Sequence, residues 1–358
     1  MKKITFVIGI LGKGGAERVI VNLANAFVKY GWQIDIITIY GDRQDYVLNK
    51  NIRVIPILCK CPIRILRPFK RFIEIRKTIK KIKPNLVVSF LADVNIHVIV
   101  SLLGIRQKLI VSERNDPQRD PEQKWMRKLR DKLYTRADGA VFQTEDAKAY
   151  FKNILTENTT TTIIPNPIKE GLPYYNKMTK SNHFITACRL NKQKNLPLMI
   201  DAMGKLIEEG YECELDIYGD GILQEEIQSY IQSKHLDRYI HLCGFSKNIH
   251  EKMKDALGFV ISSDYEGISN SMLEALAIGI PVIATDCPVG GARMYLKNNV
   301  CGYLVPCRDV NRLADAMRSV LINRDEAIQR GENATEIRKI LDPVLIADQW
   351  RKYLMQFL

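Results

Sequence analysis

The chain has 358 residues, which exceeds one typical domain and predicts two. Its hydrophobic content of 46% is ordinary for a globular protein, and no stretch approaches the roughly 18 apolar residues that a membrane-spanning helix needs. We therefore expect a protein that is soluble or lies on a membrane surface. The 53 Lys and Arg residues outnumber the 40 Asp and Glu residues, and the net charge of +13 favours an anionic partner.

Strand-like and helix-like segments alternate through the first half of the chain. Residues 4–11 are an apolar run, residues 12–15 form a glycine turn, and residues 17–30 carry apolar side chains at helical spacing. Further strands are predicted at residues 33–40, 53–58, 85–90, 108–112 and 139–143, with helices at 67–82 and about 122–136. A strand, a helix and a strand in succession favour a parallel sheet.

The alternation stops at Pro165-Asn166-Pro167, where each proline keeps the preceding residue extended, and then resumes. Later strands are predicted at residues 183–187, 213–218, 240–243, 258–262 and 281–285, with helices at 197–210, 223–235, 271–278, 313–323 and 343–358. The predicted organisation is an amino-terminal domain at 1–166, a linker at 167–182, a carboxyl-terminal domain at 183–342 and a last helix at 343–358 that packs back on the amino-terminal domain. Two α/β domains predict a binding cleft at the carboxyl ends of their strands.

The eight cysteines include no pair with the spacing Cys-x-x-Cys, and several lie in apolar segments. Reduced thiols in a cytoplasmic protein therefore fit better than disulfides or a zinc site. The five histidines show no metal-ligand spacing either, so we expect them to be structural.

Two carboxylates eight residues apart follow the strand predicted at residues 258–262. Glu266 lies just past this strand, and Glu274 lies about one turn inside the next helix. Residues 267–270 lead into that helix, whose first backbone N–H groups form a ready anion site. Both carboxylates can point into one pocket and accept hydrogen bonds from sugar hydroxyls. Two solvated glutamates on a capped helix are the alternative interpretation.

Two basic residues follow the strand predicted at residues 183–187. Arg189 offers a planar fork for phosphate oxygens, and Lys194 offers a compact charge. Together they could neutralise a diphosphate as its bond to a sugar breaks. A basic surface loop is the alternative. The nearby Tyr218-Gly219-Asp220-Gly221 indicates a tight turn at a strand end, in which Asp220 shapes the turn rather than performing chemistry.

The order Arg-(four residues)-Lys, Tyr-Gly-Asp-Gly and Glu-(seven residues)-Glu resembles the retaining glycosyltransferases of family 4. Gly14-Gly15-Ala16-Glu17 and Pro165-Asn166-Pro167 also match at the positions that this family expects. The resemblance covers essentially the whole chain. It implies the GT-B fold, in which two Rossmann-like domains with parallel sheets face each other across a cleft. The similar branch of the family builds capsule, O-antigen or lipid-linked glycan precursors.

The resemblance also implies roles for individual residues. Arg189 and Lys194 would hold the donor diphosphate, Glu274 the ribose and Glu266 the transferred sugar, so Glu266, Arg189 and Lys194 are the expected catalytic residues. The product would keep the donor's anomeric configuration, and the departing diphosphate would take the acceptor's proton. The full expected donor site is Gly15, Arg189, Lys194, Gly244, Phe245, Ser246, Glu266, Gly267, Ile268, Ser269, Asn270 and Glu274. UDP is favoured as the nucleotide, and because no Asp-x-Asp occurs, neither a metal nor a cofactor is expected.

The glycine turn at residues 12–15 follows a strand and opens a helix, which raises a nicotinamide dinucleotide site as an alternative. The fingerprint Gly-x-Gly-x-x-Gly is incomplete because position 17 is Glu. A loop that lets donor phosphates and acceptor approach closely is the better interpretation, with Gly14 and Glu17 on the acceptor side.

Residues 60–83 contain ten basic residues and one acidic residue, Glu74. On a helical projection Arg67, Lys70, Arg71, Lys77 and Lys81 share one side, and Ile65, Phe69, Phe72, Ile75 and Ile79 share the other. Anionic lipid heads or an acceptor pyrophosphate would be attracted by about 1 kcal/mol per basic residue. A solvated face over a buried apolar one is the alternative. We expect no nucleic acid partner, because no aromatic or zinc-finger motif of that kind occurs.

The remaining acceptor candidates follow the strands predicted at residues 85–90 and 108–112. They are Asp93, Asn95, Glu113 and Arg114. Some relatives place a His where this chain has Arg114, whose high pKa forbids base catalysis at neutral pH. Strand-end capping is the alternative role for these side chains.

The sequence thus predicts a retaining, metal-independent glycosyltransferase that moves a hexose or N-acetylhexosamine from a UDP-sugar to a glycan on a polyprenyl diphosphate. It would work at the cytoplasmic face of the membrane, as a peripheral protein on an anionic surface. A sugar-nucleotide epimerase of the same shape, or a non-catalytic nucleotide-sugar or membrane-surface binding protein, are the alternatives.

Overall fold

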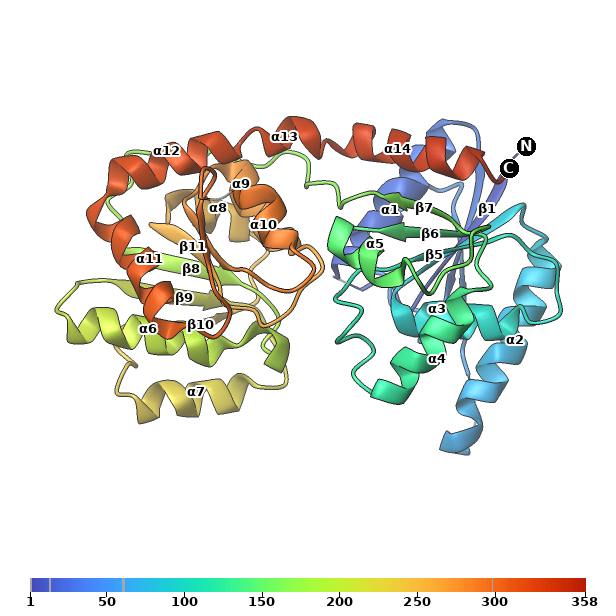
Figure 1. The fold of residues 1–358 in the computed structure, drawn as a ribbon, viewed down its shortest axis with the longest axis horizontal. Coiled ribbons are helices and arrows are strands. Elements are labelled where there is room, and N and C mark those ends of the chain that lie inside the picture. Colours follow the sequence, from blue (N-terminus) through green and yellow to red (C-terminus); the bar gives the residue numbers. More distant parts are fainter. Residues whose placement is uncertain (1, 13, 60–61, 298) are drawn as a thin grey trace. The chain divides into compact units, whose positions relative to one another are not determined.

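The computed structural model describes residues 2–12, 14–59, 62–297 and 299–358. Lys13 of the glycine turn, Lys60 of the basic segment and Cys61 lie outside the described residues. The chain forms two compact units (Figure 1). Unit 1 contains Met1–Pro167 and Pro343–Leu358, and unit 2 contains Ile168–Asp342. Residues 168–182, predicted as a linker, lie in unit 2, because Tyr175 N donates to Ile278 O at 2.8 Å and Thr179 Oγ1 to Asp255 O at 2.7 Å.

Unit 1 is built on a seven-stranded sheet with the order β3-β2-β1-β4-β5-β6-β7, and every pair is parallel. Its central strands are nearly continuous apolar runs, as expected where helices cover both faces of a sheet. The strands are β1 (Lys3–Ile8), β2 (Gln33–Thr38), β3 (Arg53–Pro56), β4 (Leu86–Phe90), β5 (Leu109–Ser112), β6 (Gly139–Phe142) and β7 (Thr160–Ile163).

The helices of unit 1 form two layers over this sheet. Figure 1 shows α2, α3 and α4 together, with α3 in contact with both neighbours, whereas α14 packs on α1. Trp350 of α14 stacks on Phe90, with the ring centroids 5.4 Å apart. The helices are α1 (Gly15–Lys29), α2 (Arg67–Ile82), α3 (Ala92–Ser101), α4 (Lys124–Tyr134), α5 (Glu145–Phe151) and α14 (Pro343–Met355).

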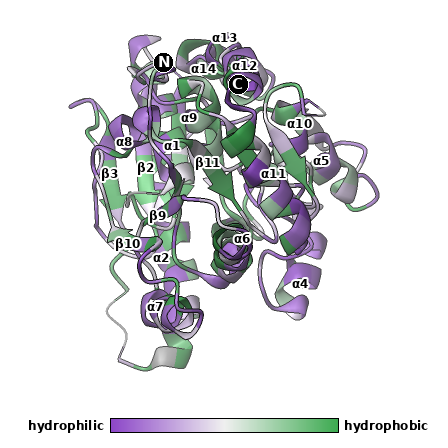
Figure 2. Cartoon of the chain, turned by 90° about the vertical axis from the view of Figure 1, so that its left-hand side faces the viewer, coloured by the Kyte–Doolittle hydropathy of each residue, from purple (hydrophilic) through white to green (hydrophobic). Residues whose placement is uncertain are grey.

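Unit 2 repeats the arrangement with a six-stranded parallel sheet of order β10-β9-β8-β11-β12-β13. In Figure 2 the central strand β11 is hydrophobic and the outer helix α7 is largely hydrophilic. The strands are β8 (His183–Ala187), β9 (Glu214–Tyr218), β10 (Ile240–Gly244), β11 (Gly258–Ile261), β12 (Val282–Thr285) and β13 (Tyr303–Val305). The helices are α6 (Leu196–Glu208), α7 (Gln224–Ser233), α8 (Ile249–Asp255), α9 (Asn270–Ile278), α10 (Gly291–Leu296), α11 (Val310–Ile322), α12 (Arg324–Ala334) and α13 (Ile337–Ile340).

The prediction of an α/β protein with two Rossmann-like domains is confirmed. In each sheet the strand order reverses once, between β1 and β4 in unit 1 and between β8 and β11 in unit 2. Ligands of such sheets bind outside the carboxyl ends of the strands at this switch point. Among the described residues, no helix combines the length and apolarity needed to cross a bilayer.

Candidate active site

The switch point of unit 2 brings together two loops that are far apart in the sequence. Residues 188–195 leave the carboxyl end of β8, and residues 262–269 leave that of its parallel neighbour β11. The loops are bonded to each other, because Asp264 N donates to Gln193 O and Ser262 Oγ donates to Lys194 O, each at 2.9 Å. The predicted basic and acidic residues therefore belong to one site.

Lys194 and Glu266 form an ion pair at the centre of this site. Their side chains are 13% and 14% exposed, so the pair is largely shielded from water. Burial lowers the pKa of the Lys194 ammonium, but the Glu266 carboxylate outweighs this effect and raises the pKa above its usual value. Gln193 Nε2 and Ser263 Oγ donate to the carboxylate at 3.1 and 2.9 Å. Neither donor was predicted from the sequence. Gln193 directly precedes the predicted Lys194, and Ser263 directly follows the strand predicted at residues 258–262.

The loop that carries Arg189 depends on the glycines of the Tyr-Gly-Asp-Gly turn. A Cβ on Gly219 would lie 1.8 Å from Cys188 O, and one on Gly221 would lie 2.2 Å from Leu190 O. No side chain fits such approaches, so both glycines let the turn lie directly against the loop. The Arg189 side chain itself is exposed at the carboxyl end of β8. The turn therefore positions a cation rather than performing chemistry.

Helix α9 begins beside the ion pair, as predicted from the polar residues at 267–270. Ser269 is its N-cap and accepts a hydrogen bond from Met272 N at 3.4 Å, while Ile268 is buried. Gly267 is approached by the start of α10, because a Cβ on Gly291 would lie 2.0 Å from Gly267 O. The adjacent pair Gly290-Gly291 was missed, although two glycines ahead of a helical run are a readable signal.

Two small hollows flank the start of α9. One is lined by Lys194, Ser263 and Ser269 among others, and the other by Glu266 and Gly267 among others. Backbone N–H groups and a lysine therefore lie beside open space, which is an arrangement suited to an anion.

Glu274 lies within α9 and is 6% exposed, but it lines neither hollow. Its Oε2 atom is 2.7 Å from Nε2 of His250 on α8, whose Nδ1 is 3.5 Å from Lys169 Nζ. His250 therefore orients the carboxylate of Glu274. The spacing of the two residues in the sequence could not indicate this contact, because β11 lies between α8 and α9 in the chain. The expectation that every histidine is merely structural therefore overlooked a contact to a candidate site residue.

Of the three residues expected against the nucleotide base, Gly244 ends β10 and the other two follow it, at the edge of the sheet. Gly244 adopts φ +65° and accepts from Gly219 N at 2.9 Å, which ties this segment to the turn behind Arg189. Phe245 is 50% exposed, and Ser246 Oγ accepts from Asn248 N at 3.2 Å. An exposed ring beside the carboxyl ends of β9 and β10 is available to a planar ligand.

In unit 1 the predicted glycine loop also lies at a switch point, after β1. Gly14 is the N-cap of α1, and the carboxylate of Glu17 fills the space where a Gly14 side chain would be, with Oε2 2.0 Å from a hypothetical Cβ. Gly15 is exposed at the helix start, and Tyr46 OH donates to Gly14 O at 3.0 Å.

Asp93 lies in a polar cluster after β4. Tyr40 OH donates to Asp93 Oδ2 at 2.8 Å, and Arg71 lies over the Tyr40 ring at 4.6 Å. Burial, followed by the Asp93 charge, raises the pKa of Tyr40 above its usual value, and burial lowers the pKa of the adjoining His97. Arg71 also donates to Ile39 O at 2.9 Å, so this member of the predicted basic face holds β2 rather than facing away from unit 1.

Glu113 and Asn95 were predicted to contact the acceptor, but both side chains are buried in the core of unit 1. Glu113 is 2% exposed and accepts from Tyr134 OH at 3.0 Å, and Asn95 Nδ2 donates to the same oxygen at 2.6 Å. Burial raises the pKa of Glu113 to about 8, despite the nearby Arg130. Glu113 follows the end of β5 as predicted, whereas Asn95 lies within α3 rather than at a strand end.

Arg114 is likewise a structural residue in this fold. Its guanidinium lies between the rings of Phe90 and Trp350, at 4.7 and 5.3 Å, and NH1 donates to Asn166 Oδ1 at 3.0 Å. Burial lowers the pKa of Arg114 to about 9, which still leaves it charged at neutral pH. Arg114 thus links β5 to α14 and to the Pro-Asn-Pro segment, and its predicted contact with the acceptor stays a prediction.

Helix α2 has the predicted bounds, and its apolar side divides into two parts. Ile75, Ile79 and Ile82 are buried. Phe69 and Ile73 in its first half remain 63 and 52% exposed. Ahead of the helix, Ile63, Ile65 and Leu66 are also exposed, at 55, 77 and 45%. A buried apolar face therefore accounts for only the second half of the helix. Lys70, Lys77 and Lys81 are exposed as expected, as is Arg67.

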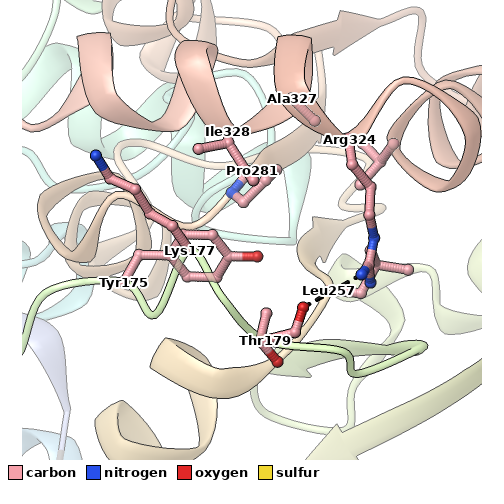
Figure 3. Close-up of a pocket in the computed structure, with 9 residues that line it drawn as sticks. Tyr175, Lys177, Thr179, Leu257, Pro281, Arg324, Ala327 and Ile328 are labelled. Carbon is pink, nitrogen blue, oxygen red and sulfur yellow. Dashed lines mark hydrogen bonds between the residues drawn. The ribbon is translucent and has the colours of Figure 1, made fainter.

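A further pocket lies at the amino ends of the strands of unit 2, among residues that include those directly before β11 and β12 (Figure 3). It is lined by Tyr175, Leu257, Pro281 and Arg324 among others, and Arg324 NH1 donates to Thr179 O at 3.2 Å. This pocket joins residues 173–182 to α12. Because it lies at the amino ends of the strands, away from the ion pair, it is not the candidate active site.

Comparisons with known proteins identify the family of the chain. The model of Glycosyltransferase Family 4 matches residues 13–171, and that of Glycosyl transferases group 1 matches residues 173–337. A relative from Campylobacter jejuni is a GalNAc-alpha-(1->4)-GalNAc-alpha-(1->3)-diNAcBac-PP-undecaprenol alpha-1,4-N-acetyl-D-galactosaminyltransferase, 27% identical over 99% of both chains.

Solved structures show the fold that this chain shares. Sucrose-phosphate synthase from Thermosynechococcus elongatus superposes with a TM-score of 0.86 at 18% identity, covering 99% of each chain. Anabaena HepE in complex with UDP-glucose superposes with a TM-score of 0.83 at 16% identity, covering 99% of this chain and 100% of the other. The fold is therefore GT-B, and the chain belongs to the family 4 glycosyltransferases, with a Glycosyltransferase Family 4 domain followed by a group 1 domain.

Proposed function

We propose that this glycosyltransferase moves a hexose or N-acetylhexosamine from a UDP-sugar to a glycan carried on a polyprenyl diphosphate, with retention of configuration. Such a step would serve bacterial surface polysaccharide or glycoconjugate synthesis. The observation that carries the proposal is the shielded Lys194–Glu266 pair beside the start of α9, at the switch point of unit 2. The C. jejuni relative supports the acceptor class, since its name specifies an undecaprenol diphosphate glycan, and the HepE complex supports UDP.

In this proposal the donor diphosphate binds where the cations and the helix start meet. Lys194 keeps its charge beside Glu266, and Arg189 extends from the same loop. The dipole of α9 adds a partial positive charge of about half a unit at the start of this helix. These groups lie in fixed positions before the reaction, so they stabilise the diphosphate charge as it develops.

Glu266 and Glu274 hold the two sugars of the donor. Glu266 is fixed by Lys194, Gln193 and Ser263, and it accepts from hydroxyls of the transferred sugar. Glu274 is fixed by His250 and accepts from the ribose. Because both carboxylates are held by neighbouring donors, they can orient the sugars with little loss of side-chain entropy.

The reaction then needs no protein base. The bond between the anomeric carbon and the diphosphate oxygen breaks, and the acceptor hydroxyl oxygen bonds to that carbon on the same face. The hydroxyl proton passes to the departing diphosphate. Arg114, where some relatives have a His, is enclosed between two aromatic rings, and its charged guanidinium would not act as a base.

We also propose that the reaction is independent of a metal, because Lys194, Arg189 and the start of α9 can neutralise the diphosphate. Dialysis against EDTA should then leave the initial rate unchanged, and added Mg²⁺ should not raise it. Loss of the rate with EDTA and its recovery with Mg²⁺ would contradict this part of the proposal.

The enzyme would work on the cytoplasmic face of the membrane, held there by α2. The helix presents exposed lysines together with the exposed apolar side chain of Phe69, and Ile65 is exposed in the turn just before the helix. Such a surface inserts apolar groups at the lipid boundary while its cations meet anionic head groups.

The double change Ile65→Ser with Phe69→Ser should weaken sedimentation with phosphatidylglycerol vesicles. Ile222→Ser, an equally apolar change at a 91% exposed position of unit 2, is the matched control. Equal binding by all three proteins would refute membrane insertion of α2.

The donor and acceptor classes are tested with a panel of UDP- and GDP-sugars, each incubated with and without a polyprenyl-diphosphate-linked glycan. UDP released only with acceptor, together with a lipid product one sugar heavier, supports the proposal. An isomer of the donor formed without acceptor would instead indicate an epimerase.

A further inference from the structure

Two cysteines lie opposite each other at the carboxyl edge of the unit 2 sheet. Strands β12 and β13 are parallel neighbours, with Thr285 paired to Val305. Asp286 N donates to Val305 O at 2.7 Å, and the chain turns directly afterwards, because Cys287 N donates to Thr285 O at 2.9 Å. Cys287 and Cys307 each follow two residues after the Thr285–Val305 pair. Neighbouring strands lie about 4.8 Å apart, which falls within the Cα separation of about 4.4–6.8 Å that a disulfide spans.

The two thiols converge on one backbone oxygen. Cys287 Sγ donates to Ser263 O at 3.0 Å, and Cys307 Sγ is 3.7 Å from the same atom. Cys287 is 3% exposed, whereas Cys307 is half-buried and can be reached by a small reagent. A hydrogen bond between the thiols lowers the pKa of Cys307 and raises that of Cys287. Cys307 is therefore the more nucleophilic of the two.

We propose that Cys287 and Cys307 form a redox-sensitive dithiol site, which a peroxide converts to an intramolecular disulfide. The Cys307 thiolate attacks one peroxide oxygen, so an S–O bond forms and the O–O bond breaks, and the departing hydroxide takes up the proton that the thiol had released and leaves as water. The Cys287 sulfur then displaces the hydroxyl from the sulfenic acid, which forms the S–S bond and releases a second water. In total, two thiols are oxidised and one hydrogen peroxide is reduced to two waters. A cellular thiol reductant reverses the step.

This dithiol is coupled to the candidate active site through Ser263. The carbonyl oxygen of Ser263 accepts from Cys287 and from Thr285 Oγ1, the latter at 2.6 Å, while its hydroxyl donates to Glu266 at 2.9 Å. A disulfide removes the thiol donors from the carbonyl and draws the two sulfur atoms together to about 2.0 Å. The loop that holds Glu266 must then shift, so oxidation should inactivate the site.

Mass spectrometry of the intact chain tests the bond directly. After titration with hydrogen peroxide, the protein should lose two hydrogen atoms in mass, and digestion should yield a crosslink between Cys287 and Cys307. The Cys307→Ser variant should not form it. Cys301→Ser is the matched control, because Cys301 is a free, buried cysteine of the same unit. The crosslink between Cys287 and Cys307 should be unchanged in this control.

Phenylarsine oxide, which bridges adjacent dithiols, should bind the wild type and Cys301→Ser but not Cys307→Ser.

Turnover is the second measurement. Oxidation should lower it by roughly 10²-fold, the loss that a displacement of about 1 Å can cause, and dithiothreitol should restore it. Cys307→Ser should keep its turnover under the same treatment. A crosslink elsewhere, or phenylarsine oxide binding that survives Cys307→Ser, would overturn the proposed site. These mass measurements do not depend on the proposed transfer reaction, so the two proposals can fail separately.

Discussion

Replacing Lys194 with Met is the sharpest perturbation of the donor site. Met keeps most of the side-chain volume but removes the ammonium that pairs with Glu266 and, in the proposed reaction, neutralises the diphosphate. Loss of one fixed donor to a developing oxyanion typically lowers kcat by about 10²–10³-fold, or about 2.7–4 kcal/mol. Breaking a buried pair also costs about 3 kcal/mol of stability, at the lower end of the usual range because Gln193 and Ser263 still donate to Glu266.

The assay compares steady-state kcat with UDP affinity by titration calorimetry, alongside urea denaturation to show that the variant is folded. Lys192→Met is the matched control, because Lys192 lies in the same turn and is exposed, so its kcat should stay at the wild-type value. In a double-mutant cycle, Glu266→Gln should cost less in the Lys194→Met background than alone, since the two side chains are in contact. Wild-type turnover in folded Lys194→Met would refute the role of this lysine.

Three other changes test separate parts of the structure. His250→Ala should raise the KM for the donor by about tenfold while kcat changes little, because it frees the carboxylate proposed to bind the ribose; an unchanged KM would argue against that role. Gly221→Ala should weaken UDP binding in calorimetry, since its Cβ would meet Leu190 O and displace the loop of Arg189; unaltered binding would show that this close approach is not needed. Glu113→Gln should flatten the pH dependence of stability: with its pKa at about 8 when folded, Glu113 keeps its proton while the unfolded chain loses it, so wild-type stability should fall by a few kcal/mol from about pH 4.5 to pH 8. Equal slopes for wild type and variant in urea denaturation would contradict that pKa.

The donor site was largely predictable because parallel strands place their carboxyl ends at one edge. Arg189 and Lys194 follow one predicted strand and Glu266 follows another, so the α/β pattern alone brings them to the same side of a sheet. Sequence could not show that β8 and β11 are neighbours. That adjacency comes from the strand order, and it makes Lys194 and Glu266 an ion pair.

The contacts of Glu274 and Arg114 could not be predicted, because each depends on an element remote in the sequence. His250 reaches Glu274 only after α8 packs on α9. Arg114 is enclosed by Trp350, which arrives with α14 from the end of the chain. Its charge suggested an acceptor contact, whereas in the structure the guanidinium stacks on two aromatic rings of unit 1.

Several helices and strands were missed for local reasons. Helix α3 is buried on almost every side, so its sequence lacks the alternation of apolar and polar residues that marks an amphipathic helix. Strand β7 is a short edge strand of three threonines and an isoleucine. In α2 the amphipathic pattern predicted the helix correctly, but the pattern could not show that the apolar residues of its first half remain exposed.

The configuration of the product is the most direct test of the proposed transfer. The purified enzyme is given a UDP-α-sugar and a polyprenyl-diphosphate-linked glycan, and the anomeric proton of the new linkage is observed by NMR. We predict an α-linked product that accumulates in step with UDP in the wild type and is nearly absent with Lys194→Met. A β-linked product, or UDP release that does not depend on the acceptor, would contradict retaining transfer at this site.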